Sequence, residues 1–277
     1  MVFLAVSDLE HVFLTRVFFT LTLPTIQKPS QSFTSPKTSK KEFRSLSMAP
    51  PRIALLLHGC GFQDGSEINE SMSFILHVDR LGASLSTFAP DIPQMHVVDH
   101  IQGAPSEETS IRSVKVESAR IVRGNIADIS TLNVNDFDAL IVPGGFGIAK
   151  NFSTFATAGK EMVVNEAVSA VLVAFHKAKK PIGLSCVAPI LIGKVLPQVK
   201  ITLGKASGED WPWAGIFNAL KDMGANVVEC EADAIVIDTE NRVVTGPAYM
   251  HNSTPYQVYT NIGDVVEATL ALIPKEE

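Results

Sequence analysis

Cysteine is scarce in this chain of 277 residues, which holds only Cys60, Cys186 and Cys230. The three are odd in number and lie far apart, and no CxxC spacing is present, so the sequence indicates neither a zinc ligand set nor a redox pair. The histidines are scattered and show no clustered ligand spacing. We therefore expect no metal site, and free thiols in a reducing compartment.

An excess of positive charge is also absent, because the formal net charge is −6. The phosphate attraction that underlies nucleic-acid binding then has no obvious source. Long apolar runs are missing as well: charged residues interrupt the apolar segment 1–27, and no run reaches the roughly 18 residues that a membrane span needs. We expect neither a nucleic acid nor a membrane as a partner.

The first 49 residues differ from the rest of the chain. Residues 28–49 are rich in Ser, Thr and Lys and have no apolar periodicity, which is typical of a flexible linker. Basic residues here resemble an organellar targeting segment, although acidic residues weaken the pattern. We expect a flexible extension over 1–49 and one domain over 50–277. The protein is then either mitochondrial or, if translation starts at Met48, cytoplasmic.

From Arg52 onward, apolar runs alternate with amphipathic segments. "RIALLLHG", "DALIVPGG" and "PIGLSC" are the kind of run that forms strands buried on both faces of a parallel sheet, and "VKITLG" and "RVVTGP" add further strands. Helical spacing appears in 66–81, with Ser66 as its N-cap, and in 162–179. This alternation predicts an α/β fold with helices on both faces of a parallel sheet. The loops that follow the strands gather at one sheet edge, where ligands bind.

One candidate nucleophile lies at that edge. Cys186 stands between a strand and the first turn of a short helix, where the helix dipole would lower the pKa of its thiol and favour the thiolate. The backbone N–H groups of Gly145 and Val187 are placed to form an oxyanion hole beside it. Free cysteines also fill strand ends without any chemistry. Position alone leaves both interpretations open.

Several motifs carry a resemblance to a known family. "ALIVPGGFG", followed further along by "GLSCVAP", resembles the ThiJ/PfpI branch of the class I glutamine amidotransferase-like superfamily. "GCGFQDGSEINE", "FAPD", "ARIVRG", "ITLG" and "VVTGPAYM" are similar to its ElbB-like members, and together these motifs span about residues 52–273. The resemblance implies a flavodoxin-like three-layer α/β sandwich with a mostly parallel sheet.

The resemblance also implies which residues form the site. Cys186 would be the nucleophile in a strand-to-helix elbow, and a glutamate of the first helix would lie beside it. That glutamate falls on Glu70, with Glu67 one helical turn earlier, and we expect Cys60 and Gly144 to line the same pocket. Burial and the nearby thiolate would raise the pKa of Glu70, so that it could exchange a proton with the sulfur. An exposed helix glutamate is the alternative.

One feature of the superfamily is missing. Many members have a histidine soon after the strand that follows the elbow, but this chain has "VKITLGKASGED" there. His251 is a candidate substitute, yet it lies just past the matching motif, so we interpret it as a surface-loop residue. A glutaminase is discounted because its late histidine and glutamate pair is absent. Trp211 and Trp213 either shield the pocket or a dimer contact, or pack on the core.

The ElbB-like resemblance implies a glyoxalase that converts an aldehyde substrate, glyoxal, to glycolate without glutathione or any cofactor. Cys186 would add to one aldehyde, the Gly145 and Val187 N–H groups would hold the hemithioacetal oxygen, and Glu70 would move a proton between the two carbons. We expect slow turnover without the histidine, and a homodimer. The alternative function is a non-catalytic protein whose thiol senses oxidants or electrophiles.

Overall fold

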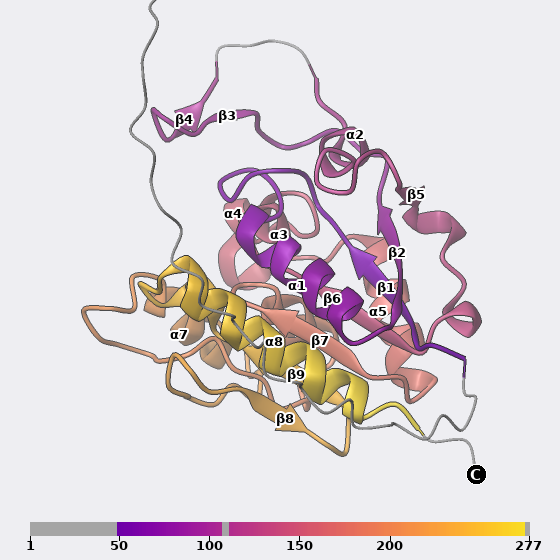
Figure 1. The fold of residues 1–277 in the computed structure, drawn as a ribbon. Helices are drawn as coiled ribbons and strands as arrows, with labels where there is room; N and C mark the ends of the chain where they lie inside the picture. Colours follow the sequence, from indigo (N-terminus) through magenta and orange to yellow (C-terminus); the bar gives the residue numbers. More distant parts are fainter. Residues whose placement is uncertain (1–48, 107–110, 275–277) are drawn as a thin grey trace, which may run out of the picture. The chain divides into compact units, whose positions relative to one another are not determined.

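The computed structural model describes residues 49–106 and 111–274. Its centre is a seven-stranded sheet with the order β5-β2-β1-β6-β7-β9-β8 (Figure 1). Every neighbouring pair is parallel except β8 and β9, which are antiparallel. The strands are β1 (Arg52–Leu56), β2 (Ser84–Ala89), β5 (Ala127–Asp128), β6 (Ala139–Val142), β7 (Ile182–Ser185), β8 (Val236–Asp238) and β9 (Val243–Gly246).

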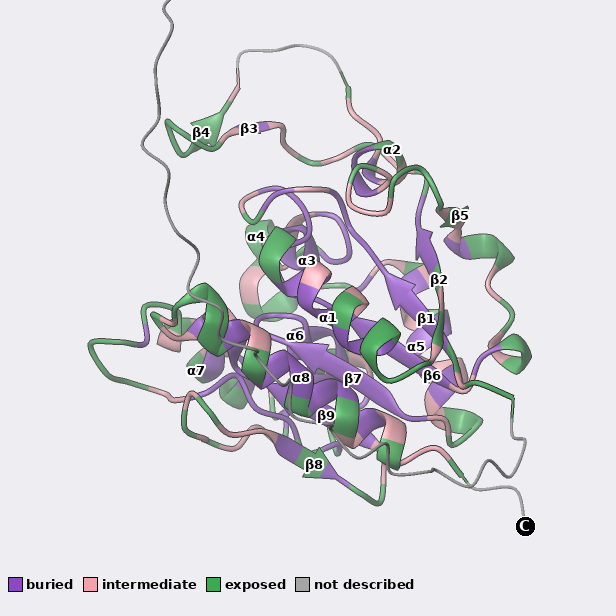
Figure 2. Cartoon of the chain, in the orientation of Figure 1, coloured by how far each residue is buried: buried purple, intermediate pink, exposed green. Residues whose placement is uncertain are grey.

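Helices cover both faces of this sheet. α1 and α8 pack against each other on one face (Figure 1), and α5 and α6 lie on the other, with α7 against α6 (Figure 2). The helices are α1 (Ile68–Arg80), α2 (Val114–Ser118), α3 (Gly147–Lys150), α4 (Phe155–Ala158), α5 (Glu166–Lys177), α6 (Pro189–Val195), α7 (Ala214–Asp222) and α8 (Pro255–Ala271). The predicted flavodoxin-like α/β fold with a mostly parallel sheet is confirmed.

Short elements fill the connections. A two-stranded ribbon, β3 (Val98–Asp99) with β4 (Ala104–Pro105), and α2 make up much of the long excursion between β2 and β5. Four 3-10 turns complete the described part, namely η1 (Ile129–Thr131), η2 (Val134–Asp136), η3 (Gly159–Glu161) and η4 (Ala248–Met250). Within the described part of the chain, every helix is too short or too polar to span a bilayer. The extension predicted over 1–49 lies outside the described residues except for Ala49.

Two local expectations were wrong. The N-cap of α1 is Glu67, whose carboxylate accepts the Glu70 N–H at 2.7 Å, whereas Ser66 uses its hydroxyl oxygen to accept the His58 N–H. The stretch "VKITLG" is not a strand of the sheet and makes only an isolated bridge at Ile201. Side-chain oxygens of β8 and β9 accept the N–H groups on either side of that bridge, so no strand ladder extends there.

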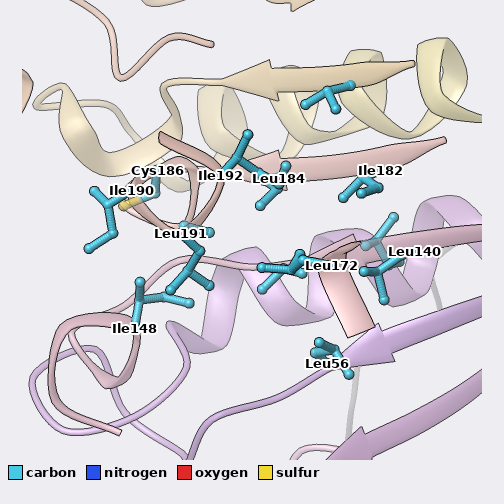
Figure 3. Close-up of a cluster of buried hydrophobic side chains, with 14 of the residues drawn as sticks. Leu56, Leu140, Ile148, Leu172, Ile182, Leu184, Cys186, Ile190, Leu191 and Ile192 are labelled. Atoms are coloured by element: carbon cyan, nitrogen blue, oxygen red, sulfur yellow. The ribbon is translucent and has the colours of Figure 1, made fainter. Parts of the chain in front are cut away.

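The core runs through the sheet to the edge where the site lies. All residues of β6, β7 and β9 are buried, as the uniform purple of these strands shows (Figure 2). Figure 3 places Cys186 at one end of the apolar cluster, close to Ile190 and Leu191 at the start of α6. This dense packing fixes the backbone from which the candidate nucleophile projects.

Candidate active site

Cys186 stands at a sharp turn between β7 and α6. Its φ angle is 57°, a left-handed conformation that costs a residue with a Cβ about 1–3 kcal/mol. The N–H of Cys186 donates to the Gly246 carbonyl at 2.9 Å, and the Ala188 N–H donates to the Ser185 carbonyl at 3.0 Å. The end of β9 therefore holds the turn in place. This geometry is the strand-to-helix elbow that the resemblance implies.

Glu70, in the first turn of α1, has no exposed surface. Its Oε2 accepts hydrogen bonds from the Gly144 N–H at 2.7 Å and from the Ser185 hydroxyl at 2.8 Å. A methyl group built on Gly144 would lie 2.9 Å from both the Cys186 Sγ and the Glu70 Oε2, so the sulfur and the carboxyl group meet at this glycine. The structure thus brings Cys186, Glu70 and Gly144 together.

Burial controls the proton chemistry of this pair. Burial, and then the negative charge of Glu67, raise the pKa of Glu70 to about 7, although its hydrogen bonds to Ser185 and Gly144 act in the opposite direction. Burial, and then the charge of Glu70, also raise the pKa of the Cys186 thiol well above its usual value. At neutral pH the resting sulfur is therefore a thiol beside a carboxyl group that is close to half ionised.

We expected the helix dipole to lower the pKa of the Cys186 thiol. This expectation was wrong, because the pKa is raised. α6 begins at Pro189, three positions beyond Cys186, and the removal of the sulfur from water outweighs the helix end. Two N–H groups do favour a charge on the sulfur, those of Val187 and Gly145, and both lower the pKa of the thiol. Among the described residues, neither of these N–H groups donates to a backbone carbonyl.

Proteins similar in sequence to this chain identify its family. No family model matches the chain. A Homo sapiens protein named "Glutamine amidotransferase-like class 1 domain-containing protein 3, mitochondrial" is 48% identical over 226 residues, which cover 81% of this chain and 84% of the human one. The chain belongs to the glutamine amidotransferase-like class 1 family. The name of the human relative places it in mitochondria, which confirms the mitochondrial alternative of our localisation prediction.

Solved structures agree with this family assignment. An isoprenoid biosynthesis protein with an amidotransferase-like domain, from Ehrlichia chaffeensis, is 35% identical with a TM-score of 0.73, and the match covers 81% of this chain and 100% of that one. Glyoxalase III from Candida albicans is 18% identical with a TM-score of 0.52, over 79% of this chain and 97% of that one. The second likeness shows the fold alone.

In this amidotransferase-like protein, the elbow opens into a cavity of about 480 Å³. Cys186, only 8% exposed, lies in its wall with Gly145, Val187 and Glu67. Burial raises the pKa of Glu67, whose carboxylate also caps α1. The remaining wall is mostly apolar and comes from segments far apart in the sequence, including Phe62, Phe146, Trp213, Ile216, Tyr249 and Met250.

Cys60 was expected in this pocket, and the structure places it elsewhere. The loop after β1 folds back so that Cys60 bridges to Ser66, and its side chain lines a separate polar cavity of about 310 Å³ with Asp64 and Glu117. Burial and the charge of Glu117 raise the pKa of its thiol. The pattern "GCGF" could not show this, because the direction of the side chain depends on how the loop folds.

Three residues near the site were misjudged or missed. His251 lies on a loop, as expected, but this loop forms part of the cavity wall; its Nδ1 is 2.9 Å from the Ser253 hydroxyl, and its ring packs edge-to-face on Trp211. Ser185 precedes the nucleophile and holds Glu70, which its place in "LSC" could have suggested. Tyr249 lines the cavity, and its hydroxyl oxygen accepts a hydrogen bond from Asn69; both residues lie in the motifs "VVTGPAYM" and "GCGFQDGSEINE", but we assigned neither to the site.

His58 has a structural role. It is fully buried, its Nε2 lies 3.1 Å from the Pro143 carbonyl, and burial lowers its pKa to about 4. Within the described ranges, no group of three or more His, Cys, Asp or Glu side chains is placed to hold a metal ion.

Proposed function

We propose that the protein is a glyoxalase-type enzyme that converts glyoxal to glycolate through a hemithioacetal on Cys186. One observation carries the proposal: a buried carboxyl group with a pKa of about 7 meets a cysteine sulfur held in a strained elbow. A group that titrates near neutral pH can both accept and return a proton. The superfamily histidine is then not needed, because Glu70 takes its place as the base.

The first step forms the carbon–sulfur bond. As the Cys186 sulfur adds to one aldehyde carbon, its proton passes to Glu70 and from there to the new oxygen, which gives the hemithioacetal. The N–H groups of Gly145 and Val187 face the sulfur and donate to no backbone carbonyl of the described residues, so they suit an oxygen that carries negative charge during the addition.

The second step moves hydrogen within the adduct. Ionised Glu70 removes the proton from the carbon that bears the sulfur and returns it to the neighbouring carbon, while the hydroxyl proton passes to the other oxygen. The result is a glycolyl thioester on Cys186, one carbon oxidised and the other reduced. Water then breaks the thioester and releases glycolate and the free thiol, so no external oxidant is required. Cofactor-free chemistry and a homodimer are part of this proposal.

The test is glycolate production from glyoxal by the full-length protein. We expect Cys186→Ser and Glu70→Gln each to lower kcat/KM by about 100-fold or more, because each removes a group that touches the reacting atoms. Cys60→Ser and Cys230→Ser are matched controls that keep the wild-type rate. A Cys186→Ser variant that still makes glycolate at the wild-type rate would falsify the mechanism.

The alternative, a thiol that senses oxidants or electrophiles, fits the geometry less well. Such sensors depend on an accessible thiolate with a low pKa. Here Cys186 as a whole is only 8% exposed, and burial raises the pKa of its thiol. Fast alkylation of Cys186 at neutral pH without any glycolate production would favour the sensor.

A further inference from the structure

The cavity beside Cys186 is much larger than glyoxal requires. Its volume is about 480 Å³, within the usual range of small-molecule pockets. Glyoxal has four heavy atoms and, at about 30 Å³ for each water-sized group, would fill roughly a quarter of that space. The rest of the cavity would then hold water against an apolar wall, which is unfavourable.

The unfilled part of the cavity has an aromatic wall. Phe146, from the loop after β6, and Trp213, just before α7, meet edge-to-face with their ring centres 5.0 Å apart. Ile216 extends this surface from the first turn of α7. Trp213 and Phe62 stay 37% and 43% exposed, so apolar surface remains in contact with water beside the site. A ligand with a flat apolar group would cover this surface and gain binding free energy.

Charge narrows the choice of ligand. The cavity lining contains no lysine or arginine among the described residues, so no permanent positive charge is placed to pair with a carboxylate or a phosphate. Within the described part of the chain, Glu67 is the one acidic side chain in the lining, and it would repel an anion when ionised. The Tyr249 oxygen accepts from Asn69, so its own proton is free to donate to a neutral carbonyl. The wall therefore favours an uncharged ligand.

We propose that the substrate class is an uncharged 2-oxoaldehyde that carries an aromatic or branched apolar substituent, with that substituent against Phe146 and Trp213. This proposal rests on the proposed function. The sulfur of Cys186 adds to the aldehyde carbon, the hydrogen of that carbon moves to the ketone carbon as a proton through Glu70, and water releases the acid. The aldehyde carbon is oxidised, the ketone carbon is reduced, and the product is a 2-hydroxy acid.

The probe is phenylglyoxal, whose product is mandelate. We expect the full-length protein to show a kcat/KM for phenylglyoxal at least tenfold above that for glyoxal, because the ring gains contacts that glyoxal cannot make. Trp213→Ala should lower the ratio of the two kcat/KM values about tenfold, and Phe62→Ala should lower it less. Tyr256→Ala is the control: this aromatic side chain on α8 is 76% exposed and lies outside the cavity, so its removal leaves the ratio unchanged.

A binding measurement separates this inference from the proposed function. Mandelamide, an uncharged analogue of the product, should bind by calorimetry several-fold more tightly than mandelate, and Trp213→Ala should weaken it. If neither aldehyde is converted but mandelamide binds in this way, the glyoxalase proposal fails and the ligand class stands. The ligand class is overturned if glyoxal is the better substrate, or if Trp213→Ala leaves both the ratio and the binding unchanged.

Discussion

Glu70 affects Cys186 in two opposite ways. In the proposed mechanism it accepts the thiol proton as a base, but its negative charge also raises the pKa of the thiol and so lowers the amount of thiolate at rest. The same carboxyl group therefore keeps the free sulfur protonated and, in the proposed mechanism, takes its proton when an aldehyde binds. Activity and simple alkylation should then respond differently to the loss of Glu70.

We expect Glu70→Gln to make Cys186 more reactive toward iodoacetamide at pH 8, by several-fold, while glycolate production is lost. The amide keeps the shape of the carboxyl group but removes the charge, so the pKa of the thiol falls and the thiolate fraction rises. Mass spectrometry of the Cys186 peptide over time measures the rate. The Cys230 peptide serves as an internal control. Slower alkylation of Cys186 in the variant would contradict this account.

At the scale of the elements, the site depends on how closely the ends of β6 and β7 approach. Gly144 follows β6 and lies directly against Cys186, and a Cβ at this position would be 2.5 Å from the Cβ of Cys186. Real Cβ atoms do not approach so closely, and both neighbours are backbone-anchored. The N–H of Gly144 also holds the Glu70 carboxyl group. One small residue thus sets the distance between the Cys186 sulfur and the Glu70 carboxyl group.

We expect Gly144→Ala to lower glyoxalase activity by about 100-fold and the free energy of unfolding by about 1–3 kcal/mol, because the added methyl group pushes the elbow and α1 apart. The matched control is Gly215→Ala in α7, where an added Cβ meets nothing within 4 Å. That change should leave activity intact and hold or slightly raise stability. Assays of both variants with urea unfolding curves check this. Full activity in Gly144→Ala would show that the spacing is not critical.

The elements that the sequence predicts well are those with an unbroken apolar run. "RIALLLHG", "DALIVPGG" and "PIGLSC" became β1, β6 and β7, because only a strand between two helix layers buries such runs completely. The strand predicted for "VKITLG" is absent from the sheet because the N–H groups of Lys200 and Thr202 donate to the side chains of Asp238 and Thr245. An apolar pattern does not reveal such side-chain contacts. The predicted pKa of the Cys186 thiol was wrong for a related reason. Burial raises this pKa, and the depth of burial depends on segments far away in the sequence.

At the scale of the whole molecule, two buried titratable groups have opposite effects on stability. Burial raises the pKa of Glu70 from about 4.5 to about 7, and burial lowers the pKa of His58 from about 6.5 to about 4. Between these values the folded state holds a proton on Glu70 that the unfolded state releases, and lacks a proton on His58 that the unfolded state binds. As pH rises through this window, Glu70 lowers the free energy of unfolding and His58 raises it.

The two contributions nearly cancel in the wild-type protein, and single variants should separate them. In Glu70→Gln the falling contribution is absent, so the free energy of unfolding relative to wild type should rise by about 3 kcal/mol between pH 4.5 and pH 7. In His58→Gln the rising contribution is absent, so the free energy of unfolding relative to wild type should fall by about the same amount between pH 4 and pH 6.5. Urea unfolding at several pH values measures both differences. Parallel curves for the wild type and the two variants would mean that neither group changes its protonation on folding.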